Sequence, residues 1–137
     1  QAQKKYIGVI VRVPLASGLL SGKFGKQTTF SPNDHRTFNR NGEAFDKGET
    51  FSGIDYNTGV DAVEELKSIF PDRNLAQLAL EWILSFDAVS TVIPGASNVS
   101  QLEANVKASN SRMESNELDL VKELYQKRIK TLVHHLW

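Results

Sequence analysis

The feature that most constrains this chain is that only two short segments have the apolar, β-branched character of strands, among several amphipathic helical stretches. Residues 6–13 are Tyr-Ile-Gly-Val-Ile-Val-Arg-Val, and residues 88–93 are Ala-Val-Ser-Thr-Val-Ile. Nearly continuous apolar runs of this length are typical of strands covered on both faces in a parallel sheet. Two such strands cannot cover themselves, because a two-stranded sheet is marginally stable in water. The pattern therefore predicts part of a larger α/β sheet whose other strands lie outside the sequence.

Composition places the chain among globular proteins, with 137 residues of which 40% are hydrophobic and 23% charged. Sixteen basic and sixteen acidic residues leave a net charge of zero, which argues against nucleic acid or an anionic membrane as partner. The absence of cysteine excludes disulfide scaffolds and thiol chemistry. We expect a cytoplasmic domain without a membrane span. Because the single methionine is Met113, we expect Gln1 to be either a processed terminus or a cut into a longer protein.

Apolar residues at helical spacing predict four helices, and their alternation with the strands predicts parallel pairing. Asn74 and Asn98 are each followed three residues later by glutamine, the spacing of a capping box at a helix start. Residues 24–57 show no periodicity, and a stretch this long is usually a lid or binding loop; its scattered phenylalanines favour packing over a free linker. The expected apolar faces are Val60, Val63, Leu66, Ile69 and Phe70; then Leu75, Leu78, Ala79, Trp82, Ile83 and Phe86; and, after the helix that begins at Asn98, Leu118, Val121, Leu124, Tyr125, Ile129 and Leu132.

Small and polar residues follow each expected strand. Residues 14–23, Pro-Leu-Ala-Ser-Gly-Leu-Leu-Ser-Gly-Lys, would let backbone amides approach an anion, and Lys23 adds a positive charge. Residues 94–105 turn into a helix whose N-terminus attracts anions, with Gln101 and Asn105 on one helix face. The alternative for the first motif is an ordinary glycine-containing turn, and the alternative for Asn98 and Gln101 in the second is simple helix capping. Both motifs nevertheless follow parallel strands, at the end where α/β proteins bind ligands.

The run from Val9 to Phe24, together with Thr91–Ser97 and the pair Gln101 and Asn105, closely resembles the C-terminal part of aldo-keto reductases. The resemblance covers essentially all 137 residues. It implies that residues 1–137 form one incomplete segment of a (β/α)8 TIM barrel, namely its seventh and eighth strands with their loops and helices. It also implies that 24–57 is a loop on the substrate and cofactor side, and that the intact enzyme is an oxidoreductase that reduces aldehydes or ketones to alcohols with NAD(P)H.

Cofactor-binding residues are implied in both motifs. The resemblance implies NADP as the cofactor. Ser97 and Asn98 are neutral where many members of the family carry a cation that pairs with the 2′-phosphate, so NAD stays open as the alternative. The resemblance assigns Arg12 to the nicotinamide face; Pro14, Leu15, Ser17, Gly18, Leu20, Gly22 and Lys23 to the pyrophosphate and ribose; and Gly95, Ala96, Ser97, Gln101 and Asn105 to the adenosine end.

No catalytic residue is assigned, because the tyrosine, lysine, aspartate and histidine that act in the family lie on earlier strands. The chain alone is therefore expected to be inactive. Tyr6, Tyr56 and Tyr125 are interpreted as packing on a strand, a loop and a helix face. The triplet 34–36, Asp-His-Arg, is either a site or a capped turn, and the adjacent histidines 134 and 135 are expected in solvent, with no metal site.

Alternatives from other classes stay open. The chain is also compatible with a non-catalytic module that senses a nucleotide or binds a protein, as channel-associated members of the resembled family do, or with an inert barrel fragment. Expected partners are a small carbonyl substrate in the intact protein and, through exposed strand edges, a second copy or the missing half of the barrel.

Overall fold

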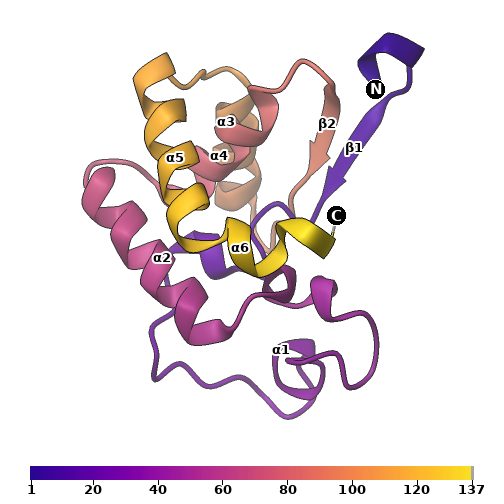
Figure 1. Ribbon diagram of the computed structural model, residues 1–137. Helices are drawn as coiled ribbons and strands as arrows, with labels where there is room; N and C mark the ends of the chain where they lie inside the picture. Colours follow the sequence, from indigo (N-terminus) through magenta and orange to yellow (C-terminus); the bar gives the residue numbers. More distant parts are fainter. Residues whose placement is uncertain (137) are drawn as a thin grey trace.

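Two parallel strands, β1 (Val9–Arg12) and β2 (Val89–Ile93), lie side by side at one edge of a mainly helical chain (Figure 1). The computed structural model describes residues 1–136. Ile10 aligns with Thr91, and the register shifts just before this pair, where the Val9 amide donates to Ser90 Oγ over 3.1 Å. The parallel pairing predicted from the alternation of strands and helices is confirmed.

The four predicted helices are present, together with two single-turn helices. Asn74 and Asn98 cap their helices by accepting from the amides of Gln77 and Gln101, at 3.1 and 2.9 Å. Among the described residues, no helix combines the length and apolar character needed to cross a membrane. The helices are α1 (His35–Phe38), α2 (Tyr56–Ile69), α3 (Leu75–Leu84), α4 (Val99–Ser109), α5 (Ser115–Arg128) and α6 (Lys130–Val133), with 3₁₀ turns at Gln3–Lys5, Leu19–Ser21, Lys47–Glu49, Phe51–Gly53 and His134–Leu136.

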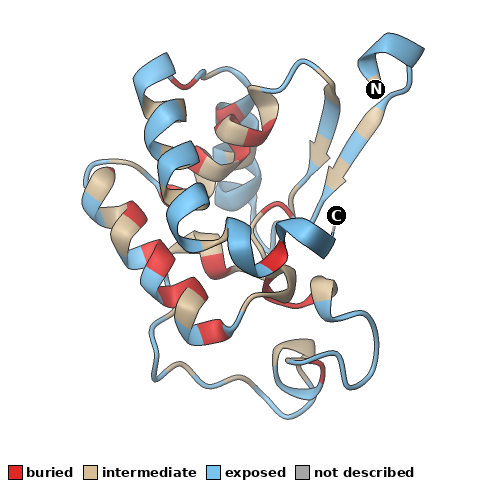
Figure 2. Cartoon of the chain, in the orientation of Figure 1, coloured by how far each residue is buried: buried red, intermediate tan, exposed pale blue. Residues whose placement is uncertain are grey.

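The core lies where α2, α3 and the turn after β1 meet, and it is the buried region in Figure 2. The predicted stripe of α2 faces it, and Leu118, Val121 and Leu124 of α5 pack against it partly buried. The buried cluster consists of Leu19, Phe51, Tyr56, Val60, Val63, Leu66, Phe70, Leu75, Leu78 and Met113.

One part of the predicted face of α3 is wrong. Phe86 is 48% exposed, whereas Leu80 and Glu81, which were not predicted to be buried, are 1% and 2% exposed. The reason is that α3 packs against α4 and β2 in addition to the core cluster. A helix covered on more than one side buries residues outside a single amphipathic stripe.

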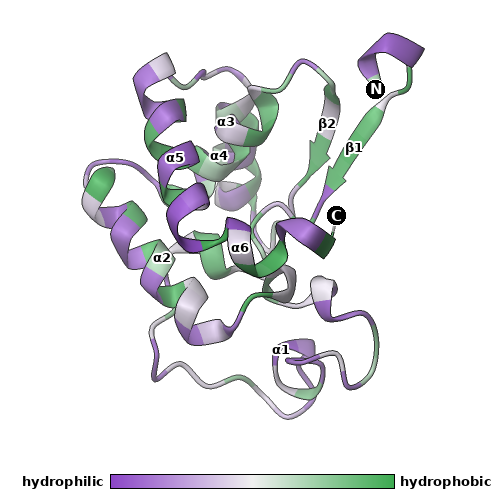
Figure 3. Cartoon of the chain, in the orientation of Figure 1, coloured by the Kyte–Doolittle hydropathy of each residue, from purple (hydrophilic) through white to green (hydrophobic). Residues whose placement is uncertain are grey.

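The prediction that both strands are buried on two faces is also wrong. Ile10 of β1 is 64% exposed, Ile93 of β2 is 55% exposed, and Tyr6, expected to pack at the start of the strand, is 98% exposed. Figure 3 shows that both strands are apolar, and Figure 2 shows that they lie at the surface. Within the described residues the sheet has two strands, so each strand keeps an open edge and uncovered side chains.

The segment 24–57 is irregular but packed. It contains α1 and two 3₁₀ turns, and its last residues enter α2. The rings of Phe30 and Phe51 lie 6.0 and 5.0 Å from that of Tyr56, and the guanidinium of Arg36 stacks 4.4 Å from the Phe30 ring centroid. The predicted packing of the phenylalanines is confirmed for these two. Phe38 and Phe45 contact each other at the surface, where each is 44% exposed.

Candidate functional site

A polar cleft of about 190 Å³ lies between the segments that follow β1 and β2. It brings together Lys23 from the first motif with Gln101 and Asn105 from the second, although these residues are far apart in the sequence. The first turn of α3 forms a third wall, which neither sequence motif includes. The complete lining is Leu15, Ser21, Lys23, Asn74, Ala76, Gln77, Gly95, Gln101, Ala104 and Asn105.

The segment after β1 reaches the cleft through a tight turn in left-handed backbone. Gly18 and Gly22 flank the 3₁₀ turn Leu19–Ser21 with φ of 89° and 72°. A Cβ on Gly18 would lie 3.1 Å from the ring of Phe24. Ala16 and Ser17 also have positive φ, 47° and 58°, a region that side chains with a Cβ rarely occupy. The two glycines therefore allow the turn to pack against its neighbours.

Most backbone amides of this turn are engaged within the turn itself. Those of Gly18 and Leu20 donate to Leu15 O at 3.0 and 3.1 Å, and that of Lys23 donates to Ser21 Oγ at 3.3 Å. The amides that were expected to bind an anion therefore already donate hydrogen bonds within the turn. The group it offers to a ligand is the ammonium of Lys23, which is exposed at the cleft and has no ion pair among the described residues.

The segment after β2 is held in place by side chains of α4. Gln101 Oε1 accepts from both the amide and the hydroxyl of Ser97, at 2.8 and 3.0 Å, and Asn105 Nδ2 donates to Gly95 O at 3.3 Å. The glutamine of the predicted capping box therefore turns toward Ser97 instead of the Asn98 amide. Ala96 is exposed and lies outside the cleft lining. Two amide side chains are thus oriented at the cleft before any ligand arrives.

Besides Ala96, seven predicted binding residues do not line the cleft. Gly18, Gly22 and Ser97 belong to the two segments just described, and the other four contact different parts of the structure. Arg12 forms two hydrogen bonds with the carboxylate of Glu49, at 3.1 and 3.2 Å. Ser17 Oγ donates to Glu49 O and accepts from the Phe51 amide, both at 3.2 Å. These two residues fasten the segment 24–57 to the end of β1. The other two, Pro14 and Leu20, face a separate apolar cavity.

The charge of the cleft favours an anion. Lys23 is the one charged residue in its lining, and the other polar groups are an alcohol and four amides. The N-terminal turn of α3, capped by Asn74, contributes the positive end of its helix dipole. A phosphate-bearing group fits this donor set, because the lining holds a cation and neutral donors without a carboxylate to repel it.

The remaining candidates have structural roles. Asp34 caps α1 by accepting from the Arg36 amide at 2.9 Å, so the triplet 34–36 forms the capped turn. The Arg36 guanidinium, hydrogen-bonded to the Asp34 side chain, lowers the pKa of that carboxyl to about 2. Tyr56 is buried and donates to Gly25 O at 2.9 Å. Tyr125 pairs with His134 Nδ1 at 2.8 Å.

Only one signal in the sequence pointed to the third wall of the cleft. Asn74 and Gln77 were visible as a helix-start pattern, and a residue that caps a helix can also line a cavity. Gln77 Nε2 donates to Glu81 Oε1 at 3.0 Å, so its side chain leaves the cap and links the cleft wall to the buried part of α3. The capping pattern alone does not predict that Asn74 and Gln77 line the cleft.

Comparison with known proteins agrees with this architecture. A sequence model of the aldo/keto reductase family matches residues 1–126. The aldo-keto reductase str7 of Strobilurus tenacellus is 30% identical over 125 residues, which is 90% of this chain and 34% of the relative. The L-glyceraldehyde 3-phosphate reductase of Escherichia coli K12 is 32% identical over 109 residues, 80% of this chain and 30% of the relative.

A glycerol dehydrogenase from Gluconobacter oxydans has a similar fold, with a TM-score of 0.69 at 22% identity over 93% of this chain and 37% of that chain. The α/β fold is thus similar to part of an aldo-keto reductase barrel protein. The chain spans about a third of the length of the curated relatives it matches. On the family match across most of its length, the chain belongs to the aldo/keto reductase family.

Proposed function

We propose that this chain is the cofactor-binding part of an NAD(P)H-dependent oxidoreductase that reduces aldehydes or ketones to alcohols. The observation that carries the proposal is the polar cleft in which Lys23 meets Gln101 and Asn105 beyond the ends of two parallel strands. Membership of a family of oxidoreductases supports the reaction class. The nicotinamide, when bound, supplies the hydride that adds to the carbonyl carbon.

Lys23, Gln101 and Asn105 are the residues that would hold the dinucleotide. Lys23 supplies charge, and the two amides supply donors and acceptors whose orientation is set by Ser97 and Gly95. The cleft of about 190 Å³ is smaller than the ~300–1,000 Å³ typical of a complete ligand pocket. It would therefore take one phosphate-bearing part of the dinucleotide and leave the rest outside.

We propose further that residues 1–137 are the C-terminal segment of a (β/α)8 barrel, with β1 and β2 as its seventh and eighth strands and 24–57 as a loop on the ligand side. The order of the two motifs supports this placement, and so do the exposed apolar residues of the sheet. Ile10 and Ile93 are 64% and 55% exposed, which suits strands that pack against further strands. Those strands would come from another part of the protein or from a second copy.

The chain by itself is expected to bind cofactor without turnover. A tyrosine needs neighbours that adjust its acidity to act as a proton donor near neutral pH. Tyr6 is exposed, Tyr56 is held by Gly25 O, and Tyr125 pairs with His134. None of the three lines the polar cleft.

Calorimetric titration with NADPH tests the proposal. Lys23→Gln should weaken binding by roughly tenfold or more, the size of one charge-assisted hydrogen bond. Lys26→Gln is the matched control, because Lys26 pairs with Asp61 at 2.6 Å outside the cleft. Equal affinities for the two variants would place the cofactor elsewhere. The same titration with NADH shows whether Lys23 binds the additional phosphate of NADPH.

A separate activity assay tests whether the isolated chain is inactive. Oxidation of NADPH with propanal above background would contradict that expectation.

A further inference from the structure

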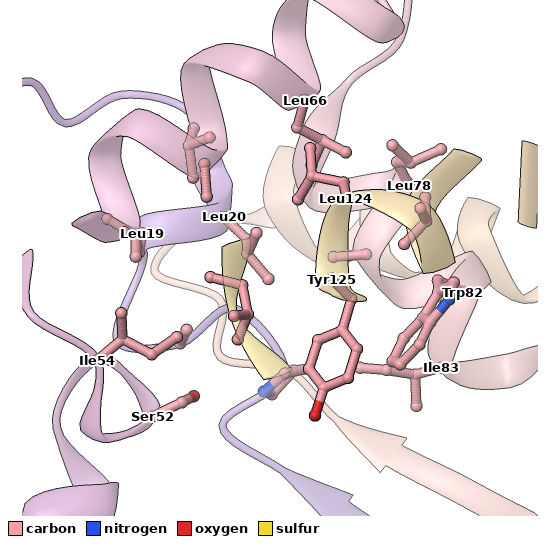
Figure 4. Close-up of a pocket in the computed structure, with 18 of the residues that line it drawn as sticks. Leu19, Leu20, Ser52, Ile54, Leu66, Leu78, Trp82, Ile83, Leu124 and Tyr125 are labelled. Carbon is pink, nitrogen blue, oxygen red and sulfur yellow. The ribbon is translucent and has the colours of Figure 1, made fainter. Parts of the chain in front are cut away.

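A second cavity, of about 320 Å³, lies among α2, α3, α5 and α6 (Figure 4). One turn separates the two cavities. Leu15, Ser21 and Lys23 line the polar cleft, whereas Ala16, Leu19 and Leu20 line this second cavity. The second cavity therefore takes no part in the proposed cofactor site.

Small residues on two facing helices keep the cavity open. Gly59 and Ala62 of α2 and Ala79 of α3 all contribute to its wall. A Cβ on Gly59 would lie 2.6 Å from Leu19 Cδ2, so a larger residue there would displace the Leu19 side chain. The cavity is partly open to solvent, and its volume falls within the range typical of ligand pockets, which makes it a candidate ligand site.

The wall is apolar and carries no charged side chain. Leucine, isoleucine, valine and alanine side chains dominate it, and Trp82 lies against it. Apolar molecules bind favourably against such a wall, because the contact removes apolar surface from water. Bringing a carboxylate or an ammonium into it would leave that charge without a partner, at a large desolvation cost.

Polar groups occur at one end of the cavity. Tyr125 Oη is hydrogen-bonded to His134 Nδ1 at 2.8 Å, and Ser52 lies across from Tyr125 with its hydroxyl directed toward the cavity (Figure 4). The Ser52 side chain is partly buried and makes none of the side-chain hydrogen bonds found among residues 1–136. Its backbone φ is 56°, a left-handed conformation that is costly for serine.

We infer that this cavity binds a neutral, mainly aliphatic molecule with one hydroxyl or carbonyl group, such as a medium-chain alcohol. The aliphatic part lies against the leucine side chains, and the polar group meets Ser52 and Tyr125. An apolar cavity of about 150 Å³ accommodates benzene, so about 320 Å³ accommodates roughly ten to twelve non-hydrogen atoms.

Trp82 provides the readout. In a Trp137→Phe chain it is the single tryptophan, because the sequence holds two. Titration with 1-nonanol should change Trp82 fluorescence saturably, with one molecule bound per chain. Nonanoate at pH 8 should bind at least tenfold more weakly, since its charge finds no partner in the wall.

Three variants locate the ligand. Ala79→Leu places a larger side chain in the cavity and should abolish the Trp82 fluorescence response to nonanol. Its far-UV circular dichroism spectrum should stay unchanged. If that variant does not fold, Ala62→Val fills the opposite wall instead. Ser52→Ala and Tyr125→Phe should weaken nonanol about three- to tenfold, the value of one hydrogen bond, and leave the affinity for nonane unchanged. Ala88→Leu, outside the cavity lining, is the control and should bind as the parent chain does.

Several results would overturn the inference. These are a fluorescence change that does not saturate, an equal response in Ala79→Leu, or nonanoate binding as tightly as nonanol. A signal that depends on protein concentration instead of alcohol concentration would assign the cavity to contact with a second copy. Because Lys23→Gln does not alter this wall, nonanol binding by that variant separates the inference from the proposed cofactor site.

Discussion

The carboxylate of Glu81, 2% exposed within α3, pairs with the guanidinium of Arg73 from the turn before that helix. Arg73 also pairs with Glu117 of α5, and Glu81 accepts from Gln77 at 3.0 Å. A buried carboxylate is tolerated only when its charge is compensated in this way. The network joins α3 and α5 and reaches the wall of the polar cleft through Gln77.

Arg73→Met should therefore destabilise the chain strongly. Removing one partner of a buried pair leaves an uncompensated charge, at a cost of about 3–5 kcal/mol in unfolding free energy. Urea unfolding measures this loss. Glu64→Gln, which removes an exposed pair with Lys67, is the control and should cost less than about 0.5 kcal/mol. A similar loss in both variants would show that Glu81 does not depend on Arg73.

Asn39 is the buried anchor of the irregular segment. It is 0% exposed, its Oδ1 accepts from the amides of Ala44 and Phe45 at 2.9 and 2.7 Å, and its Nδ2 donates to Thr50 Oγ1 at 3.2 Å. Asn39→Asp keeps the acceptor, loses the donor and adds a buried charge.

We expect Asn39→Asp to lower the unfolding free energy by about 1–3 kcal/mol or more and to expose residues 40–50 to proteolysis. Asn57→Asp makes the same chemical change at an exposed position in the first turn of α2, where a negative charge suits the helix dipole. It should leave both measurements nearly unchanged. Equal protease resistance of Asn39→Asp and the parent chain would rule out the anchoring role.

Gly18→Ala should distort the turn that carries Lys23. Its φ of 89° disfavours a side chain, and the new Cβ would press against the Phe24 ring. We expect a loss of at least about 1–2 kcal/mol in stability and weaker NADPH binding by calorimetry. Gly25→Ala, which meets nothing within 4 Å, should change neither property, and it controls for the loss of a glycine.

Asp34 makes the stability of the chain sensitive to acid. The hydrogen bond from Arg36 lowers the folded-state pKa of Asp34 to about 2 from its ordinary value of 3.8. Its contribution is therefore fully present above about pH 4 and is lost as the pH falls toward 2. Asp34→Asn should be less stable than the parent at pH 6, with the difference shrinking as the pH is lowered to 2. Asp87→Asn removes an exposed carboxylate that makes no side-chain hydrogen bond within residues 1–136, and it should follow the parent curve in parallel. A constant deficit for Asp34→Asn would contradict the linkage.

Local chemistry accounts for the features that the sequence predicted correctly. Asn74 and Asn98 start their helices because each side chain satisfies an amide three residues away. The stripe of α2 from Val60 to Phe70 is buried because one helix face meets the core. The two motifs meet at one cleft because parallel strands end at the same edge of a sheet.

Tertiary context decides what the sequence did not predict. Glu81 is tolerated in the interior because Arg73 pairs with it. The helical periodicity of the sequence does not predict this ion pair. Arg12 turns to Glu49, and Ser17 to the backbone of the same segment, because 24–57 folds back over the end of β1. Tyr6 stays exposed because nothing among residues 1–136 covers the start of β1. Each of these outcomes depends on a partner distant in the sequence.

The parallel pairing of β1 with β2 also imposes a delay during synthesis. Seventy-six residues separate Arg12 from Val89. At a translation rate of about 5–20 residues per second, β1 leaves the ribosome roughly 4–15 s before its partner strand has been made. During that interval Ile10 and the valines beside it cannot pair with β2. Because α2 and α3 lie between the two strands in the sequence, both helices are made before the β1–β2 ladder can form.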